Sequence, residues 1–540
     1  MKRYLLILSI GAFSFLSFKA ADYFEIAKNL EIFVEVYKEV NTTYVDETKP
    51  GKLIRAAIDG MLKSLDPYTN FYSEAQAEDY RYQVTGTYAG IGAAIKTIDD
   101  QIFIDSPLEG FPCQQADLRA GDEIIAIDGV PIQNKSTDEI KEMLKGNVGS
   151  IVEIEVNRLG AGILKKRIER KNITQKNVPY AKVIDGIGYI KLVGFTPNAG
   201  KEVRDAVVDL KNSGAKELVL DLRNNGGGLL NEAINIVNVF VPRGQVVVET
   251  RGKFPEDNRM FKTLNSPVDT VIPLAILING RSASASEIVA GAIQDLDRGI
   301  LIGNNSFGKG LVQTTKGLVY NTSMKITTAK YFIPSGRLIQ RLDYSNKVDG
   351  RALAVADSTK QSFKTKNGRT VIDGQGIEPD VKVDHSPLSE LSQSLRENHL
   401  FFKFGTVYVS QHDTLVSPLQ FQLSDAVYKQ FCAFIKDKKY AYTTRTEKEI
   451  KRLETQVKKD KYDQLLSTEL AALRSAIQRI KTQDTENYRA EITELLEWEI
   501  ARRYYFERGG IEARFDEDID WEKSVEILSD AQAYNHYLNP

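Results

Sequence analysis

Residues 217–228 read Glu-Leu-Val-Leu-Asp-Leu-Arg-Asn-Asn-Gly-Gly-Gly, a short apolar run that ends in polar residues and three glycines. An apolar run of this length, bounded by turn residues, predicts a buried strand. Apolar residues at helical spacing follow over 229–240, so the stretch predicts a strand, a turn and a helix in succession. This order is the building unit of a parallel sheet.

The same order is repeated on both sides of this stretch. We expect further strands at 187–192, 274–278 and 299–303, and helices at 203–210 and 287–295. Strand, helix and strand in repetition predict parallel strands joined by right-handed crossovers. Strands near 327–333 and Lys382 are expected to complete or flank the sheet. The sequence therefore predicts a parallel-rich α/β domain.

Three of the predicted strand ends carry small or polar residues, at 221–228, 279–287 and 304–310. Ligand sites in open α/β sheets gather at the carboxyl ends of the strands, so the three segments should meet at one edge. The 25 residues from Ser284 to Lys309 are what one helix and one return strand would occupy. We therefore expect Ser284 and Lys309 to lie close together.

This pair of residues has a chemical logic. A serine hydroxyl is a poor nucleophile until a base takes its proton. All four histidines, the usual bases, lie beyond residue 384, at positions 385, 399, 412 and 536. Lys309 can serve instead if desolvation lowers its pKa far enough to leave a neutral amine. Gln313 could hydrogen-bond that amine and fix its direction without adding a negative charge.

Acyl transfer also needs hydrogen-bond donors for the developing oxyanion. Ala285 follows the serine at a strand-to-helix junction, where its N–H is free, and Gly226 or Gly227 can bring a second N–H close. Each motif taken alone has an ordinary interpretation. The serine run could be a helix N-cap, the lysine could be solvated, and the glycine turn could bind a phosphate, although the G-x-x-x-x-G-K-S/T order of a phosphate-binding loop is absent. Their joint occurrence at one predicted edge favours a catalytic site.

Residues 84–168 show a different pattern of short strands, with a hairpin signal at Asp128-Gly129 and a helix that begins with a Ser136–Glu139 capping box. Together with Gly90-Ile91-Gly92 and the strand entry at 118–122, this order resembles a PDZ domain. The resemblance implies that a peptide is bound by strand addition, with Gly90, Ile91 and Gly92 holding its terminal carboxylate. The alternative is that the Gly-x-Gly is simply a turn.

The two ends of the chain carry helical patterns. Lys2, Arg3 and the apolar stretch 4–18 before small residues predict a signal peptide over 1–20, with a retained membrane anchor as the alternative. A helical domain is expected over 21–83 and a second, charged one over 386–540. In the latter, apolar residues at 466, 470, 473, 477 and 480 predict a packing face, with a dimer or adaptor contact as the minor alternative.

Composition excludes several functions. Lys plus Arg number 71 and Asp plus Glu 73, a net charge of −2, which gives no reason to expect a nucleic-acid partner. There is no H-E-x-x-H or C-x-x-C motif, so we expect neither a metal nor another cofactor. Cys113 and Cys432 are far apart in sequence and are expected to be isolated buried thiols rather than a disulfide.

The serine and lysine motifs resemble those of the carboxyl-terminal processing, or tail-specific, proteases. The shared features are Ser-Ala-Ser-Ala-Ser-Glu-Ile at 282–288, the lysine of Phe-Gly-Lys-Gly 25 residues after Ser284, and a glutamine four residues later. Further matches lie at 65–68, 188–190, 221–225, 331–337 and 376–380, so the resemblance covers about residues 40 to 385. One departure is Gly226, where that family often has proline.

The resemblance implies a serine endopeptidase in which Ser284, Lys309 and Gln313 are catalytic and the glycine turn and Ala285 bind the oxyanion. It also implies a crotonase-like protease core over 169–385 and an extracytoplasmic, for instance periplasmic, enzyme that captures C-terminal tails of polypeptides through its PDZ domain. Two alternatives stay open: a non-catalytic PDZ scaffold, and a crotonase-type acyl-CoA enzyme, which would tolerate Ser284→Ala.

Overall fold

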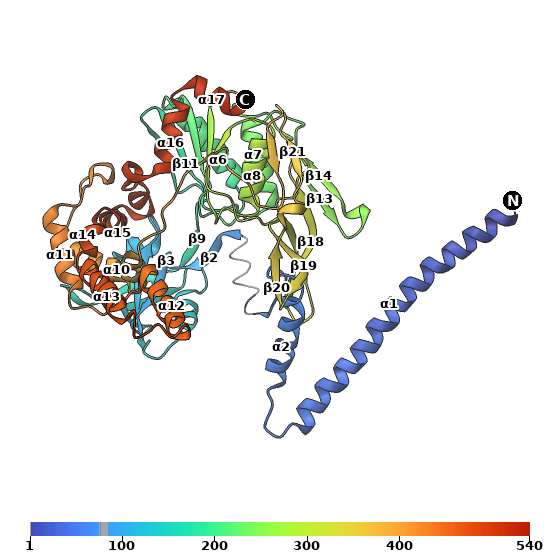
Figure 1. Ribbon diagram of the computed structural model, residues 1–540, viewed down its shortest axis with the longest axis horizontal. Helices are drawn as coiled ribbons and strands as arrows, with labels where there is room; N and C mark the ends of the chain where they lie inside the picture. Colours follow the sequence, from blue (N-terminus) through green and yellow to red (C-terminus); the bar gives the residue numbers. More distant parts are fainter. Residues whose placement is uncertain (1, 75, 77–84, 540) are drawn as a thin grey trace. The chain divides into compact units, whose positions relative to one another are not determined.

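The computed structural model describes residues 2–74, 76 and 85–539, with side chains from residue 23 onward. The chain forms two compact units. The first comprises Met1–Glu78, Val312–Ala329 and Asp343–Leu353, and the second Asp79–Leu311, Lys330–Leu342 and Ala354–Pro540. Figure 1 shows the elements of both.

The first unit contains the helices expected near the N-terminus. These are α1 (Lys2–Thr43) and α2 (Pro50–Lys63), and β1 (Asn70–Tyr72) follows and pairs antiparallel with β18 (Ser323–Phe332). β18 also pairs with β17 (Leu311–Gly317), and β19 (Leu342–Val348) pairs with β20 (Arg351–Ala354). The side chains of Ile26 and Leu30 on α1 are exposed. None of the helices in the described part of the chain is long and apolar enough to cross a membrane.

The second unit begins with an antiparallel domain that has the order expected of a PDZ domain. Its sheet runs β3-β4-β5-β7-β8, with β6 beside β5. The strands are β3 (Ala93–Ile98), β4 (Gln101–Pro107), β5 (Glu123–Ile127), β6 (Val130–Pro131), β7 (Ile151–Arg158) and β8 (Gly162–Glu169), with helices α4 (Pro112–Gln115) and α5 (Thr137–Leu144) and the separate pair β2 (Thr87–Gly90) and β9 (Lys171–Thr174).

The local signals read in this domain are confirmed. Asp128 and Gly129 both have positive φ, 50° and 73°, as a tight hairpin between β5 and β6 requires. Ser136 and Glu139 form the capping box at the start of α5, with Ser136 N–H donating to the Glu139 carboxylate at 2.8 Å. Cys113 is a free thiol inside the domain core, and Cys432 is also free but only partly buried.

The α/β core is a six-stranded sheet in the order β10-β11-β12-β15-β16-β23, parallel except for β10. Its strands are β10 (Tyr180–Ile184), β11 (Ile187–Lys191), β12 (Glu217–Asp221), β15 (Leu274–Ile278), β16 (Ile300–Gly303) and β23 (Val381–Lys382), and its crossover helices are α6 (Ala199–Asn212), α7 (Leu230–Phe240) and α8 (Ala285–Asp295). The predicted strands and helices thus form as expected. Shorter pairs flank the core, namely β13 (Val246–Gly252) with β14 (Arg259–Lys262) and β21 (Ser362–Lys364) with β22 (Thr370–Ile372).

The order of the parallel strands follows the order of the sequence, and right-handed crossovers then place α6, α7 and α8 on one face of the sheet. A parallel sheet must be covered on both faces. The second face is covered by the C-terminal elements η4 (Phe515–Glu517), α16 (Ile519–Leu528) and α17 (Ala531–Leu538), shown in red in Figure 1. Phe515 and Trp521 pack there against Tyr189, Val219 and other residues of that face.

The segment 386–540 therefore contributes to two cores, although the sequence suggested a single helical region. Its earlier helices form a separate core around Phe401, Phe431 and Ile492. They are α9 (Glu390–Glu397), α10 (Leu400–Gln411), α11 (Asp425–Ile435), α12 (Arg445–Lys459), α13 (Ser467–Lys481), α14 (Asp484–Asn487) and α15 (Arg489–Glu512). On α13 the predicted apolar face is largely uncovered, with Leu473 42% and Ile480 54% exposed. Its role in an oligomer or adaptor contact stays a prediction.

Candidate active site

The serine-bearing segment follows the carboxyl end of β15 and leads into α8. Ser284 occupies the N-cap position with φ 57° and ψ −112°, a conformation that is sterically unfavourable for a residue with a Cβ. Its side chain is half-buried, whereas Ala283 and Ala285 on either side are buried. Backbone strain of this kind persists only where the surrounding structure fixes it, and it concentrates at functional sites.

The flanking serines hold this segment against the neighbouring strand end. The Ser282 hydroxyl donates to the carbonyl of Leu222 at 2.9 Å, and the Ser286 hydroxyl donates to the carbonyl of Asn225 at 2.9 Å. The Ala283 N–H also donates to the Asn225 carbonyl, at 3.0 Å. The two outer serines therefore tie the 221–228 segment to the segment that carries Ser284.

Glu287, one turn into α8, joins the serine segment to the lysine segment. Its side chain is fully buried. One carboxylate oxygen accepts the backbone N–H groups of Ser284 at 2.8 Å and Lys309 at 2.9 Å, and the other accepts the Gly308 N–H at 2.7 Å and the Ser306 hydroxyl at 2.5 Å. Burial raises the pKa of Glu287 to about 7, against these hydrogen bonds, which lower it.

Tyr331 joins the same two segments through their carbonyl groups. Its hydroxyl lies 2.6 Å from the carbonyl oxygen of Lys309 and 3.2 Å from that of Ser284, and the tyrosine is almost fully buried. The Phe307 N–H donates in addition to the Ser282 carbonyl at 3.0 Å. The structure thus brings Ser284 and Lys309 into adjacent segments, as the sequence predicts, and the Lys309 side chain is half-buried.

The glycine turn touches the serine directly. Gly227 has φ +94°, and a Cβ on it would lie 2.6 Å from the Ala283 carbonyl oxygen and 2.9 Å from the Ser284 Cβ, so glycine is required. A Cβ on Gly226 would meet no atom within 4 Å. The close approach to the serine therefore belongs to Gly227 and not to Gly226.

The two proposed oxyanion donors differ in their present partners. Ala285 is the first residue of α8, where a backbone N–H has no acceptor within the helix. The Gly227 N–H donates to the side-chain oxygen of Asn225 at 3.0 Å, so this amide would have to exchange that acceptor for an oxyanion. Which glycine supplies the second donor stays a prediction.

Gln313 belongs to the first compact unit, whereas Ser284 and Lys309 belong to the second. Within its unit the Gln313 amide donates to the Thr327 hydroxyl at 3.2 Å, and the Thr327 N–H donates to the Thr69 hydroxyl at 3.2 Å. Asp66 accepts the backbone N–H of Thr69 at 2.8 Å, which links the Leu-Asp-Pro-Tyr motif to this strand. The contact of Gln313 with the lysine amine stays a prediction.

Of the predicted peptide-binding residues, Gly90 ends β2, and Ile91 and Gly92 form the turn that leads into β3. Ile91 is buried, and Gly92 has φ +76°. The strand and helix that flank a PDZ groove meet at one point, where the Thr97 and Thr137 hydroxyls lie 2.8 Å apart. The binding of a terminal carboxylate by these residues stays a prediction.

Sequence reasoning gave no role to Glu287 or Tyr331. The spacing of Glu287, three residues after Ser284, is a capping-box signal that predicts its bond to the Ser284 N–H. Nothing in the local pattern reveals that the same carboxylate also reaches residues 306–309, because that contact depends on the packing of two separate strand ends.

Comparison with known proteins agrees with this architecture. Residues 186–349 match the family model "Peptidase family S41", residues 103–158 match "PDZ domain", and residues 391–528 match "Probable PDZ-protease, C-terminal helical domain". A "Carboxy-terminal-processing protease" of Bartonella bacilliformis is 38% identical over 318 residues, 58% of this chain and 73% of that protein. A "Probable CtpA-like serine protease" of Staphylococcus aureus is 33% identical over 381 residues, 70% of this chain and 69% of that protein.

Among solved structures, the photosystem II D1 C-terminal processing protease is 26% identical and matches with a TM-score of 0.35, covering 65% of this chain and 92% of that one. The α/β core, the PDZ domain and the matched family define a serine-type peptidase. The chain belongs to the carboxyl-terminal processing protease family.

Proposed function

We propose that this protein is an exported endopeptidase that cleaves peptide bonds with a Ser284–Lys309 dyad and selects its substrates by their C-terminal tails. The observation that supports the proposal is that two side chains each bind both the Ser284 segment and the Lys309 segment. One buried carboxylate accepts the N–H of both Ser284 and Lys309, and one tyrosine hydroxyl contacts both carbonyls. A protein that did not use the two residues together would have little need to fix both.

In this mechanism the neutral Lys309 amine takes the proton of the Ser284 hydroxyl as the hydroxyl attacks the substrate carbonyl. The amine then returns the proton to the leaving nitrogen of the cleaved peptide bond. The Lys309 side chain is half-buried, and the neutral amine that this step needs is part of the proposal. Gln313, four residues later in the chain, is proposed to orient the amine.

The oxyanion of the tetrahedral intermediate is proposed to bind the N–H of Ala285 and one N–H of the Gly226–Gly227 pair. The N-terminus of α8 supplies a favourable dipole at this point. Each donor stabilises charge that develops only in the transition state, and loss of one donor typically lowers the rate by about 10²-fold or more.

The PDZ domain is proposed to bind the C-terminal residues of unfolded or marked polypeptides by adding them as a strand to β3. The loop 90–92 precedes this strand and would hold the terminal carboxylate. A PDZ domain of a Vibrio cholerae carboxy-terminal protease, solved with a peptide, is 29% identical to this region, covers 16% of this chain and 99% of that one, and has a TM-score of 0.16. We also propose an extracytoplasmic location, which rests on the basic and apolar pattern of residues 2–18.

The test is to incubate the protein and its Ser284→Ala and Lys309→Ala variants with an unfolded protein and to map the products by mass spectrometry. Cleavage by the wild type and its loss in both variants would support the dyad. Unchanged cleavage by Ser284→Ala would contradict it. An enzyme of the acyl-CoA type would tolerate this substitution, and a scaffold would cleave nothing in any form.

A further inference from the structure

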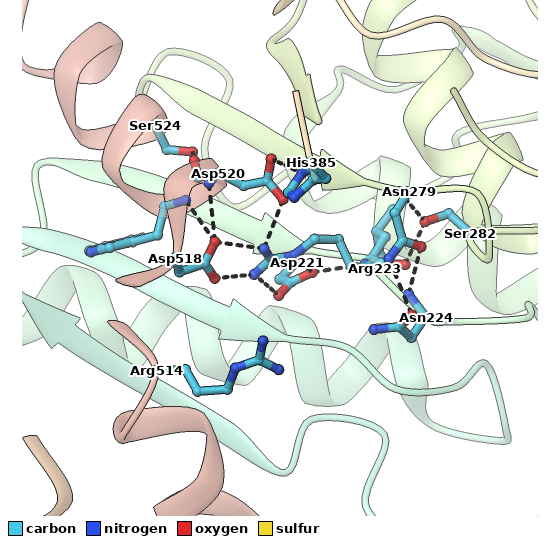
Figure 2. Close-up of polar contacts among 12 residues, drawn as sticks. Asp221, Arg223, Asn224, Asn279, Ser282, His385, Arg514, Asp518, Asp520 and Ser524 are labelled. Carbon is cyan, nitrogen blue, oxygen red and sulfur yellow. Dashed lines mark hydrogen bonds and ion pairs between the residues drawn. The ribbon is translucent and has the colours of Figure 1, made fainter. Parts of the chain in front are cut away.

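One arginine at the carboxyl end of β12 connects the catalytic edge of the sheet to the C-terminal helices (Figure 2). The Arg223 guanidinium donates to both carboxylate oxygens of Asp518, at 2.7 and 2.6 Å, and to Asp520 at 2.9 Å. It also donates to both oxygens of Asp221, at 3.1 and 2.8 Å. A single guanidinium thus holds three carboxylates, two of which lie about 300 residues further along the chain.

The C-terminal partners of this arginine are themselves firmly placed. Asp518 is the N-cap of α16 and accepts the backbone N–H groups of Asp520 and Trp521 at 3.1 Å each. Asp520 is fully buried, and its other oxygen lies 3.0 Å from the His385 ring. Because Trp521 packs into the apolar layer on the sheet, the start of α16 is a fixed support.

The main chain of Arg223 is held as tightly as its side chain. Its N–H donates to Asp221 at 2.8 Å, and its carbonyl accepts the Lys191 ammonium group at 3.0 Å. The next residue, Asn224, has φ 62° and donates its N–H to the Asn279 side chain at 3.1 Å. The chain is therefore constrained at every residue between the end of β12 and the turn that follows.

This constrained stretch leads directly to the glycine turn. Asn225, two residues after Arg223, accepts the Gly227 N–H through its side chain and donates its amide to the Leu192 carbonyl at 2.8 Å. Gly227 in turn lies against the Ala283 carbonyl oxygen and the Ser284 Cβ without room for a Cβ of its own. A shift of Arg223 would consequently move the glycine turn relative to the serine.

We propose that Arg223 is a positioning residue through which the start of α16 holds the Gly226–Gly227 turn at the distance from Ser284 that the oxyanion requires. The inference rests on the proposed function, because it assigns the turn to the oxyanion site. It gives the C-terminal helices a part in the chemistry as well as in covering the sheet.

The ion pairs of Arg223 with its three carboxylate partners are not needed merely to dock the C-terminal elements on the sheet. The apolar residues of η4, α16 and α17 already bury a continuous surface against the sheet. Buried ion pairs gain little stability over apolar contacts, because desolvation offsets their attraction. Charged hydrogen bonds with a planar, bidentate geometry do fix direction, which suits a positioning role.

The test uses Asp518→Asn, because asparagine caps helices as well as aspartate does and so keeps the start of α16 while removing the charge. We expect kcat on an unfolded protein substrate to fall about tenfold or more, with KM unchanged, because an oxyanion contact acts only in the transition state. The matched control is Tyr534→Phe, which removes the hydroxyl that accepts the Leu274 N–H at 3.0 Å, at the amino end of β15.

The control should lose stability but keep its kcat. The proposal is overturned if Asp518→Asn keeps the wild-type kcat, or if kcat falls equally in both variants, since the ion pairs would then serve only to dock the helices. Should Asp518→Asn fail to fold, Arg223→Lys replaces it, with the same expected split between kcat and KM. Retained cleavage by Ser284→Ala would instead defeat the proposed function itself, so the two failures are distinguishable.

Discussion

The PDZ domain and the catalytic edge of the α/β core differ in which residue types adopt unfavourable backbone conformations. In the PDZ domain the non-glycine residues with positive φ are all aspartate or asparagine, which tolerate that conformation, namely Asp99, Asp100, Asp117, Asp128 and Asn134. At the catalytic edge a serine adopts φ 57°, and a fully buried glutamate lies beside it. Residues that violate local preferences are retained where function requires them, and substitutions should therefore change stability in the first region and rate in the second.

The sharpest test of this contrast is within the serine motif. Ser284→Ala should lower turnover by about 10⁴-fold or more, because it removes the nucleophile. Ser286→Ala is the matched control: the Ala283 N–H still donates to the Asn225 carbonyl when the Ser286 hydroxyl is removed, so the variant should lower the free energy of unfolding by about 1 kcal/mol and keep most of the turnover. Cleavage assays and thermal unfolding on both variants measure this. Equal losses of turnover would remove the distinction between the serines.

The glycine turn offers the second test. Gly227→Ala should lower kcat by about 10²-fold, since its Cβ would collide with the Ser284 segment and displace an oxyanion donor. Gly226→Ala should stay close to the wild type, because its Cβ enters open space. The measurement is the steady-state kcat of the two variants. A larger fall in kcat for Gly226→Ala than for Gly227→Ala would contradict the assignment of Gly227 as the residue packed against the serine segment.

Glu287→Gln should lower kcat by about tenfold. The carboxylate accepts four hydrogen bonds, and glutamine would direct its NH₂ group at two of the donors, which loosens the tie between Ser284 and Lys309. The measurement is kcat and KM of the variant, with Glu397→Gln on α9 as a surface control. A kcat equal to that of the wild type would show that the Glu287 hydrogen bonds between the two segments are not needed for turnover.

The same residue gives a pH dependence of stability. Burial raises the pKa of Glu287 from 4.5 to about 7, so between these values the folded protein binds more protons than the unfolded chain. The stability contributed by the protonated form is complete below about pH 4.5 and is lost as the pH rises through 7. Relative to Glu287→Gln, the wild type should lose about 3 kcal/mol of unfolding free energy across this window, measured by denaturant unfolding. A constant difference between the two proteins would contradict the shift.

The smallest effect is expected in the PDZ domain. Ser136→Ala removes the acceptor for the Glu139 N–H at the start of α5 and should cost about 1 kcal/mol of stability without changing kcat on a substrate that does not need the PDZ domain. Ser136→Asp, which keeps an acceptor, is the control. Chemical unfolding and peptide cleavage measure the two quantities, and a loss of kcat would show that this region also shapes the catalytic site.

Much of the α/β core could be predicted from the sequence, because its signals are local. The strands over 217–221 and 274–278 form with the predicted bounds, since each is a short apolar run between turn residues. The meeting of the serine and lysine segments followed from the rule that parallel strands end at one edge.

The contacts that complete the site could not be predicted in this way. Glu287 has the pattern of an ordinary acid in the first turn of a helix, and its fourfold hydrogen bonding appears only when 306–309 is packed beside it. The pairing of Arg223 with Asp518 joins segments about 300 residues apart. Helical periodicity shows that α16 has an apolar face, but it does not show that the sheet is what covers that face.

The central claim, that Ser284 is the nucleophile and Lys309 its base, is tested most directly by covalent labelling. The protein is treated with a fluorophosphonate, digested and analysed by mass spectrometry, beside Lys309→Ala. The account predicts an adduct on the peptide that contains Ser284, formed far more slowly when Lys309 is replaced. Labelling at another residue, or an equal rate of Ser284 labelling without Lys309, would contradict it.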